Sequence, residues 1–315
     1  MKSSDFHWVE ELMGSQYIHW ERVQELWSGY GQIIRLYFED NTSVIVKEID
    51  YSGGSDHPRG WSSKVSDNRK RKSYEVELNW YKGQARQLDE MTKIPTLLGV
   101  KKNKKTSFIL EDLNALGYNQ RLSTLDLEGA QSCLKWLARF HATFLGAEPI
   151  GLWPIGTYWH LHTRPDEFNR MEDSWLKTNA SRIDSALNNS TYRTFVHGDA
   201  KVANFCFGQN RSNVAALDFQ YVGGGCGMKD VAYFISSCLE SDDAAKWESQ
   251  LLDTYFKELK SRVPDVEFRK LESEWRALYP VAWADFVRFL LGWAPDHYKL
   301  NEYSLLQVEK AKKYF

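Results

Sequence analysis

The sequence predicts an α+β fold with two unequal lobes, a small β-rich lobe over residues 1–113 and a larger, mainly helical lobe over residues 114–315. Short β-branched segments bounded by turns gather in the first lobe, whereas apolar residues spaced three and four apart prevail from residue 123 onward. A length of 315 residues suits one large domain or two lobes that share a cleft, and an apolar content of 43% is enough for a sizeable core.

Composition narrows the class of protein. The formal net charge is −2, so no overall attraction to nucleic acid or to an anionic membrane is expected. The four cysteines form no C-x-x-C pair, which favours free thiols in a reducing compartment over disulfides or structural zinc. The sequence begins without an apolar signal segment and contains no apolar run of about 18 residues. We therefore expect a soluble, cytoplasmic protein with no nucleic-acid or membrane partner, and its oligomeric state stays open.

The first lobe is expected to contain an antiparallel strand pair, Ile33–Phe38 and Ser43–Glu48, joined by a turn. Residues 51–72 lack periodicity and are rich in Gly, Ser and charge, which predicts a mobile loop. Its basic end, Arg69–Lys72, is typical of a solvated surface. The other elements expected here are helices over residues 5–27 and 73–91 and strands over residues 94–100 and 107–110.

The second lobe is expected to be mostly helical, with a few short strands between its helices. The helices are expected over residues 126–145 and 167–189 and within residues 229–315. The strands are expected over residues 193–196, 205–207 and 214–217.

The clearest chemical signal is the segment Val196–Asn204, which reads VHGDAKVAN, followed by Ala216–Gln220, which reads ALDFQ. An H-x-D-x-x-x-x-N segment followed by a strand that ends in Asp-Phe is typical of phosphotransferases of the protein-kinase type. Phosphoryl transfer needs a carboxylate to orient and deprotonate the attacking hydroxyl, and hard oxygen ligands to hold Mg²⁺. We therefore expect Asp199 to be the catalytic base, Asn204 a neutral Mg²⁺ ligand and Asp218 the main anionic ligand.

The first lobe offers the complementary residues for binding the phosphates of ATP. A strand lysine should reach the α- and β-phosphates, and a helix glutamate should hold that lysine in place. Lys47, which follows the apolar stretch SVIV, fits the lysine; Glu77 fits its partner, with Glu75 as the competing candidate. Gly29 and Gly31 form either a phosphate-covering loop or a plain turn.

Residues 108–113 read FILEDL, a strand that runs into a linker. In a two-lobed kinase this position lines the adenine slot, and the backbone of Glu111 and Leu113 would supply its hydrogen bonds.

Taken in order, these motifs resemble the aminoglycoside phosphotransferase and choline kinase superfamily, and within it the ecdysteroid kinase-like (CHK kinase-like) family. The closer resemblance lies in four features, namely Glu77-x-x-Trp80-Tyr81, the stretch Leu110–Leu113, Asp218-Phe219-Gln220 in place of Asp-Phe-Gly, and the stretch Lys229–Phe234. It spans roughly residues 20–240 and implies a two-lobed protein-kinase-like fold, ATP and Mg²⁺. Carried over by position, it implies the roles given above for Lys47, Glu77, Asp199, Asn204 and Asp218.

Other residues near the motifs carry narrower expectations. Lys201 stands two residues after the expected base, as in serine/threonine protein kinases, so it either meets the γ-phosphate or is a solvated loop lysine. Asp230 is expected to brace the catalytic loop, His141 to pack inside a helix bundle, and His197 to orient the loop rather than accept a proton.

The acceptor is expected to be a small molecule with a hydroxyl group. Asp218 and Asp230 lie only twelve positions apart, which leaves no room for the activation segment and Ala-Pro-Glu end of a protein kinase. Trp283, Asp285 and Trp293 either border the acceptor pocket or belong to a buried helix face. The alternatives are a nucleotide-binding pseudokinase that acts as a regulatory scaffold and, less favoured, a protein kinase.

Overall fold

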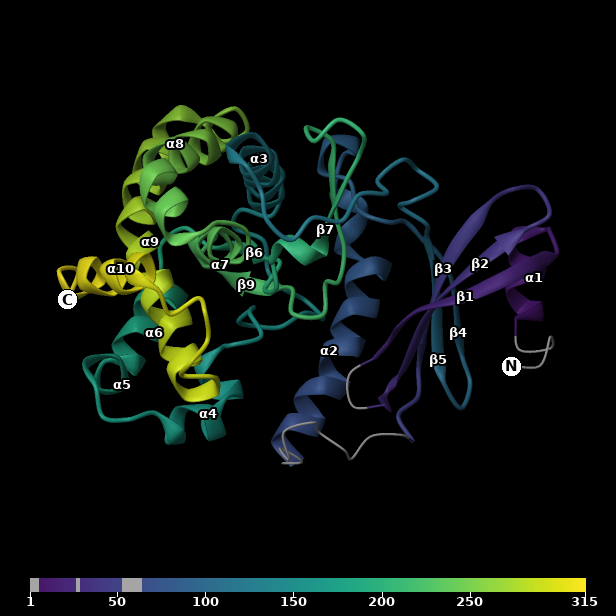
Figure 1. The fold of residues 1–315 in the computed structure, drawn as a ribbon, viewed down its shortest axis with the longest axis horizontal. Coiled ribbons are helices and arrows are strands. Elements are labelled where there is room, and N and C mark those ends of the chain that lie inside the picture. Colours follow the sequence, from purple (N-terminus) through teal and green to yellow (C-terminus); the bar gives the residue numbers. More distant parts are fainter. Residues whose placement is uncertain (1–5, 27–28, 53–63) are drawn as a thin grey trace.

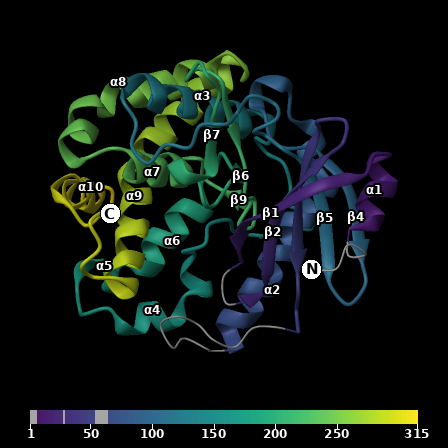
Figure 2. The ribbon, with the colours of Figure 1, turned by 45° about the vertical axis from the view of Figure 1, so that its right-hand side comes forward.

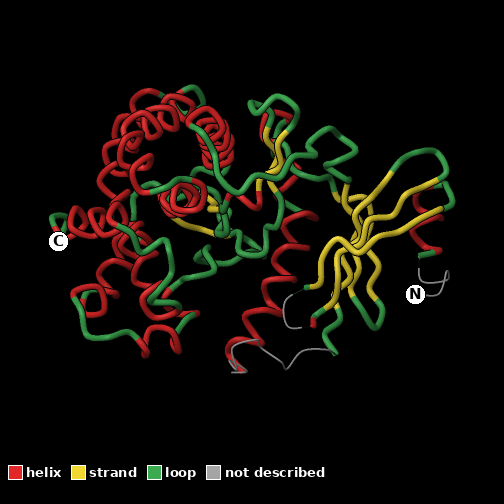
Figure 3. The backbone as a smooth tube through the Cα atoms, viewed as in Figure 1, coloured by secondary structure: helices red, strands yellow, loops and turns green. Residues whose placement is uncertain are grey.

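The protein has a strand-rich part and a helix-rich part, with helix α2 (Lys64–Lys82) lying between them (Figures 1 and 3). A computed structural model describes residues 6–26, 29–52 and 64–315. The arrangement confirms the predicted α+β class, with a small antiparallel sheet in the first lobe and a helical second lobe.

The first lobe is built on one five-stranded antiparallel sheet with the order β1-β2-β3-β5-β4. Its strands are β1 (Tyr17–Glu25), β2 (Gly31–Phe38), β3 (Ser43–Ile49), β4 (Leu97–Lys102) and β5 (Thr106–Glu111). The predicted pairing of the two strands within residues 33–48 is confirmed, because β2 and β3 pair from Gly31 opposite Ile49 to Tyr37 opposite Ser43.

The two faces of this sheet have different neighbours. Val44 and Val46 of β3 pack with Ile34 and with Val9 of helix α1 (His7–Met13), in an apolar cluster on the outer face. Figure 2 shows α1 on the side of the sheet that faces away from the helical lobe. Because side chains alternate along a strand, Lys47 points to the opposite face, toward α2.

Four predicted elements of the chain are wrong in extent or type. Residues 5–27 do not form one helix, because α1 ends at Gly14 in the left-handed conformation (φ 68°) and β1 follows. The loop predicted at 51–72 is shorter, because residues 64–72 are the first turns of α2; residues 53–63 lie outside the described part of the chain.

The helix predicted over 73–91 ends at Lys82 and gives way to two short 3₁₀ turns, η3 (Gln84–Gln87) and η4 (Glu90–Thr92). The helix predicted over 167–189 is broken into α4 (Pro165–Arg170), α5 (Trp175–Thr178) and α6 (Ala180–Asn188). The break has a local cause, since Met171 is non-helical (φ −58°, ψ 138°) and the Ser174 side chain caps a new helix at the amide of Lys177.

The second lobe is mostly helical, as predicted, and most of its helices pack on an apolar core that extends into the first lobe. The long helices are α3 (Leu127–Thr143), α7 (Met228–Cys238), α8 (Ser241–Lys260), α9 (Asp265–Trp293) and α10 (Glu302–Lys312). Within residues 6–26, 29–52 and 64–315, no helix combines the length and apolar character that a membrane span requires.

Two small antiparallel sheets in the second lobe position the motif segments. Strand β6 (Thr194–Val196) pairs with β9 (Gly223–Gly225), and β7 (Phe205–Phe207) pairs with β8 (Val214–Ala216). The loop between β6 and β7 and the loop between β8 and β9 are therefore held side by side at both ends. The sequence did not predict β9, whose glycines lie so close to Trp153 and Pro154 that a Cβ at Gly223 would come within 2.2 Å of a backbone oxygen.

Candidate active site

A cavity of about 1120 Å³ lies between the two lobes. Its walls come from the sheet, from α2, from the connection at residues 110–113 and from the two motif loops, together with parts of α7 and α9. The volume exceeds the roughly 300–1,000 Å³ of a typical small-molecule pocket, so the cavity has room for two reactants.

The loop between β6 and β7 is held in place by a buried carboxylate. Asp230 accepts hydrogen bonds from the backbone amides of His197 (2.5 Å) and Gly198 (3.0 Å), and it also contacts the ring of His141 at 3.1 Å. Gly198 has φ 79°, and a Cβ there would lie 2.1 Å from the carbonyl oxygen of Tyr221. The expected bracing role of Asp230 and the packing role of His141, which is fully buried, are confirmed.

His197 links the two motif loops. Its Nε2–H donates to the carbonyl of Leu217 at 3.0 Å, and its Nδ1 accepts from the amide of Asp199 at 3.3 Å. Both ring nitrogens are engaged with backbone groups and the side chain is fully buried. This arrangement confirms that His197 orients the loop.

Asp199 projects into the cavity, and three side chains hydrogen-bond to its carboxylate. Lys201 Nζ donates to Oδ2 at 3.0 Å, Asn204 Nδ2 donates to the same oxygen at 3.1 Å, and the Tyr233 hydroxyl donates to Oδ1 at 3.1 Å. Burial alone would lower the pKa of Lys201, but the charges of Asp199 and Asp218 outweigh burial and raise it. Lys201 therefore stays protonated beside the carboxylate.

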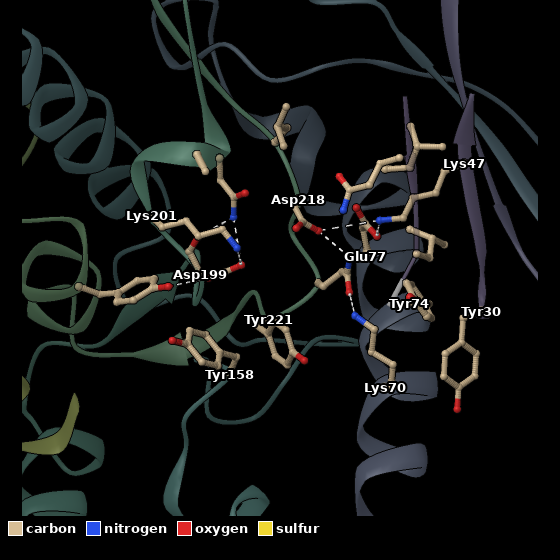
Figure 4. Close-up of a pocket in the computed structure, with 18 of the residues that line it drawn as sticks. Tyr30, Lys47, Lys70, Tyr74, Glu77, Tyr158, Asp199, Lys201, Asp218 and Tyr221 are labelled. Carbon is tan, nitrogen blue, oxygen red and sulfur yellow. Dashed lines mark hydrogen bonds and ion pairs between the residues drawn. The ribbon is translucent and has the colours of Figure 1, made fainter. Parts of the chain in front are cut away.

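Lys47 lies opposite this group and is paired with Glu77, not with the exposed Glu75. Its Nζ lies 2.6 Å from Glu77 Oε2 and 3.9 Å from Asp218 Oδ1. Figure 4 shows Asp218 between the Lys47–Glu77 pair and the Asp199–Lys201 pair. Burial raises the pKa of Glu77 to about 7, against the opposing effect of Lys47.

Asp218 is held in an unusual backbone conformation at the centre of the cavity. Its φ of 68° lies in the left-handed region, which non-glycine residues adopt rarely and which is concentrated at functional sites. Burial would raise the pKa of its carboxyl group, but Lys47, Lys201 and Lys70 together lower it. Asp218 is therefore an ionised carboxylate surrounded by cations.

Lys70 reaches Asp218 through an amide side chain. Gln220 donates to Asp218 Oδ1 at 2.6 Å, and its Oε1 accepts from Lys70 Nζ at 2.9 Å. Arg69 donates to the carbonyl of Thr163 in the other lobe at 2.6 Å. The prediction that residues 69–72 form a solvated surface is thus wrong for Arg69 and Lys70, because α2 begins earlier than expected and directs both side chains into the cavity.

The remaining predicted residues fall into two groups. Glu111 and Leu113 line the cavity, as does Trp293. The others do not line it. Gly29 and Gly31 line a separate small recess with Glu48 and Lys105. Trp283 packs against Tyr279 and Tyr303, and Asp285 is buried against Arg288 and Trp159. The acceptor-pocket alternative for Trp283 and Asp285 is therefore corrected, because α9 turns both side chains into the core.

The protein-family comparison agrees with this geometry. The model of the ecdysteroid kinase-like family matches residues 65–146 and 157–268, which include nearly all of α2, the loop between β6 and β7, the Asp218 segment and α7. The chain belongs to the ecdysteroid kinase-like family. No curated protein sequence matches it.

Solved structures with the same fold are distant in sequence from this ecdysteroid kinase-like chain. A putative fructosamine-3-kinase from Thermobifida fusca is 16% identical over 100% of this chain and 99% of that chain, with a TM-score of 0.56. A putative aminoglycoside phosphotransferase from Ralstonia eutropha is 12% identical over 98% and 95%, with a TM-score of 0.51. A microcompartment-associated aminopropanol kinase is 13% identical over 98% and 95%, with a TM-score of 0.51. These likenesses establish the two-lobed kinase fold.

Several cavity residues of this ecdysteroid kinase-like chain carry no recognisable signal in the sequence. Tyr158, Arg164 and Lys299 lie in irregular segments whose composition carries no signal for a site. Tyr233 is different, because it belongs to the stretch KDVAYF that supported the resemblance, three residues after Asp230 on α7. Asp230 braces the loop between β6 and β7, and a side chain one helical turn after it can reach the same loop.

Proposed function

We propose that this protein transfers the γ-phosphate of ATP to a hydroxyl group of a small molecule, in a reaction that requires Mg²⁺. The observation that carries the proposal is the convergence of Asp199, Asp218 and the Lys47–Glu77 pair on one cavity, each fixed by hydrogen bonds or ion pairs. The names of the kinases that share its fold support a small acceptor, since two of them name fructosamine and aminopropanol.

The residues present fit a magnesium ion. Asp218 offers an ionised carboxylate, and Asn204 donates its amide nitrogen to Asp199, which leaves the amide oxygen as a ligand. The described residues contain no group of three or more His, Cys, Asp or Glu side chains that could hold a metal ion. This agrees with Mg²⁺, which is commonly bound by one or two carboxylates together with substrate phosphates. Bound there, the ion would neutralise charge on the phosphates.

The nucleotide is proposed to lie against the connection between the lobes, whose boundary we place at Leu113. Ile33, Ile45 and Leu217 supply apolar surface to this end of the cavity. The Leu113 carbonyl accepts from the amide of Tyr118 at 2.8 Å, while its own amide donates to no acceptor among the described residues. That amide is therefore free to donate to a purine ring nitrogen, and Lys47 is positioned to bind the phosphates.

In the proposed reaction the acceptor hydroxyl forms a bond to the γ-phosphorus while the bond to the bridging oxygen of ADP breaks. Asp199 accepts the proton of the hydroxyl, and its three hydrogen-bond donors hold the carboxylate toward the acceptor. Lys201, which stays protonated, is placed to stabilise the transferred phosphoryl group.

The test is ADP release with a panel of hydroxylated small molecules, in the presence and absence of Mg²⁺. Asp199→Asn keeps the shape of the side chain but cannot take the proton, so kcat should fall by about 10²–10⁴ while Mg-ATP affinity changes little. A fall of less than about fivefold would contradict the role of Asp199 as base. Nucleotide binding without turnover under any condition would instead support a pseudokinase.

A further inference from the structure

Lys299 lies in the connection between α9 and α10, on the side of the cavity away from the sheet. It is a buried lysine, 8% exposed, yet it lines the cavity with its neighbours His297 and Tyr298. A buried ammonium normally requires an anion or several hydrogen-bond acceptors, because losing water is costly for a charged group.

Lys299 differs in this respect from the other cations of the cavity. Of the lysines and arginines that line it in the described part of the chain, all except Lys299 donate to an oxygen of the protein at 2.6–3.0 Å, namely Arg35, Lys47, Arg69, Lys70, Arg121, Arg164 and Lys201. No carboxylate among residues 6–26, 29–52 and 64–315 forms an ion pair with Lys299.

The close neighbours of its ammonium are aromatic rings. Nζ lies 4.7 Å from the ring centre of Tyr233 and 5.5 Å from that of Phe286. These contacts do not replace lost hydration in full, because burial lowers the pKa of Lys299 to about 8 despite the nearby charge of Asp199. The ammonium thus retains donors that no oxygen of the described residues satisfies.

The same aromatic residues continue into an apolar wall. Tyr158 packs edge-on against Tyr233 and Phe289, and Phe289 stacks on Trp293 at 5.6 Å. Tyr158 is itself fixed to the catalytic loop, since its amide donates to the carbonyl of Gly198 at 3.1 Å. Such a wall suits a flat apolar molecule rather than a sugar covered with hydroxyl groups.

Tyr233 connects this wall to the proposed base. Its hydroxyl donates to Asp199 at 3.1 Å, while its ring face contacts Lys299. The base and the unpaired ammonium are therefore separated by about one tyrosine side chain. One molecule of modest size can reach both.

We propose that the acceptor is a flat apolar molecule that carries an anionic group, a carboxylate, sulfonate or phosphate, and that Lys299 binds this group while Asp199 faces the hydroxyl. The proposal rests on the proposed function and specifies the acceptor class. The proposal predicts that an anionic group strengthens the binding of an aromatic ligand beside Lys299, although the carboxylates of Asp199 and Asp218 would repel that group.

Two matched fluorescent probes test the proposal without turnover. 8-Anilinonaphthalene-1-sulfonate and N-phenyl-1-naphthylamine have the same aromatic skeleton and differ in the sulfonate. In the parent protein at pH 7, Lys299 should favour the sulfonate, so Lys299→Met should lower the ratio of sulfonate to neutral affinity about tenfold or more. Lys299→Arg keeps the charge and should preserve most of the ratio.

Lys246→Met is the matched control, because Lys246 also lies over an aromatic ring, that of Trp247, but is exposed and outside the cavity. This variant should leave the ratio unchanged. An unchanged ratio in Lys299→Met, folded as judged by its melting temperature, would overturn the proposal. A loss of Mg-ADP affinity in that variant with an unchanged ratio would assign Lys299 to the phosphates instead, which also overturns it.

The outcomes separate this proposal from the proposed function. Because neither probe requires catalysis, a protein that shows the expected ratio but releases no ADP would contradict the phosphotransferase activity and still support the anion site. If Lys299→Met does not fold, a ratio in Lys299→Gln equal to that of the parent would overturn the proposal, and a fall of about tenfold would support it.

Discussion

On the side of the cavity that holds Lys47, Glu77 and Asp218, opposite charges face one another at 2.6 and 3.9 Å. On the side that holds Phe289 and Trp293, aromatic rings stack and the ammonium of Lys299 contacts ring faces. The charged groups of the first side are paired with one another, as suits a ligand common to many kinases. The second side leaves one charged group to be satisfied by whatever binds there, so it is the side that should determine the acceptor.

The largest effect should follow from neutralising Asp218. Asp218→Asn removes an ionised carboxylate from among three lysines and should abolish turnover and weaken Mg-ATP binding, because Mg²⁺ loses its anionic ligand. Asparagine tolerates the left-handed conformation at φ 68° at least as well as aspartate, so the fold should persist. Turnover is measured by ADP release and nucleotide affinity by calorimetry.

Asp67→Asn is the control for that change. Asp67 also lines the cavity, but its carboxylate is partly exposed and pairs with Arg71 at 2.7 Å. The variant should keep its Mg²⁺ dependence and its turnover. Equal losses in the two variants, or full activity in Asp218→Asn, would show that Asp218 is not the main metal ligand.

The ion pair of Lys47 should give the next largest effect. Glu77→Gln leaves the Lys47 ammonium without its buried partner, so the KM for ATP should rise and kcat should fall, together at least tenfold in kcat/KM. Glu75→Gln makes the same change two residues away on the exposed face of α2 and should leave both constants unchanged. Steady-state kinetics with ATP as the varied substrate would contradict the pairing if Glu75→Gln were the more damaged enzyme.

The nucleotide side of the cavity could be predicted from the sequence, whereas the acceptor side could not. Lys47, Asp199, Asn204 and Asp218 could be placed because each lies in a short motif whose order along the chain is constrained by one reaction. The strands at residues 31–49 could also be predicted, since the alternation of apolar and polar residues and the turn between the strands are local signals. Local signals were misleading at residues 17–25, where pairing with β2 decides the structure and apolar spacing does not.

The acceptor side could not be predicted because it is assembled from distant segments. Tyr158 and Tyr233 lie far in the sequence from each other and from the neighbouring positions Phe289 and Lys299, and only the folded chain brings them to one wall. Aromatic residues are common in the core as well, so Trp283 looked as suitable as Trp293 until the direction of each side chain was known. Direction on a buried helix depends on tertiary contacts, which no local pattern encodes.

A smaller effect is expected at Tyr233, where the two sides meet. Tyr233→Phe keeps the ring under Lys299 but removes one hydrogen bond to Asp199, so kcat should fall by about 2- to 12-fold while Mg-ATP affinity stays unchanged. Tyr279→Phe removes a comparable buried hydrogen bond, 3.0 Å to Tyr303, outside the cavity, and should lower the melting temperature without changing kcat. A kcat effect of equal size in both variants would mean that Tyr233 acts through stability alone.

The last prediction concerns pH and the charge of Lys299. With its pKa lowered to about 8, Lys299 is protonated at pH 6.5 and loses its charge as the pH rises through about 8. The affinity for 8-anilinonaphthalene-1-sulfonate should therefore fall gradually above that pH, by about tenfold per unit at the steepest, while the affinity for N-phenyl-1-naphthylamine stays level. Fluorescence titrations of both probes at half-unit steps from pH 6.5 to pH 9.5 measure this difference.

Three titratable groups near Lys299 keep their protons through this pH window. Burial raises the pKa of Tyr233 and that of Cys238 on α7, and the charges of Asp199 and Asp218 raise that of Lys201 against the effect of burial. All three therefore keep their protons while Lys299 loses its own. The pH dependence should disappear in Lys299→Met and move to higher pH in Lys299→Arg, because the guanidinium keeps its charge throughout the range. A parent-like fall in sulfonate affinity in Lys299→Met would mean that another group binds the anion.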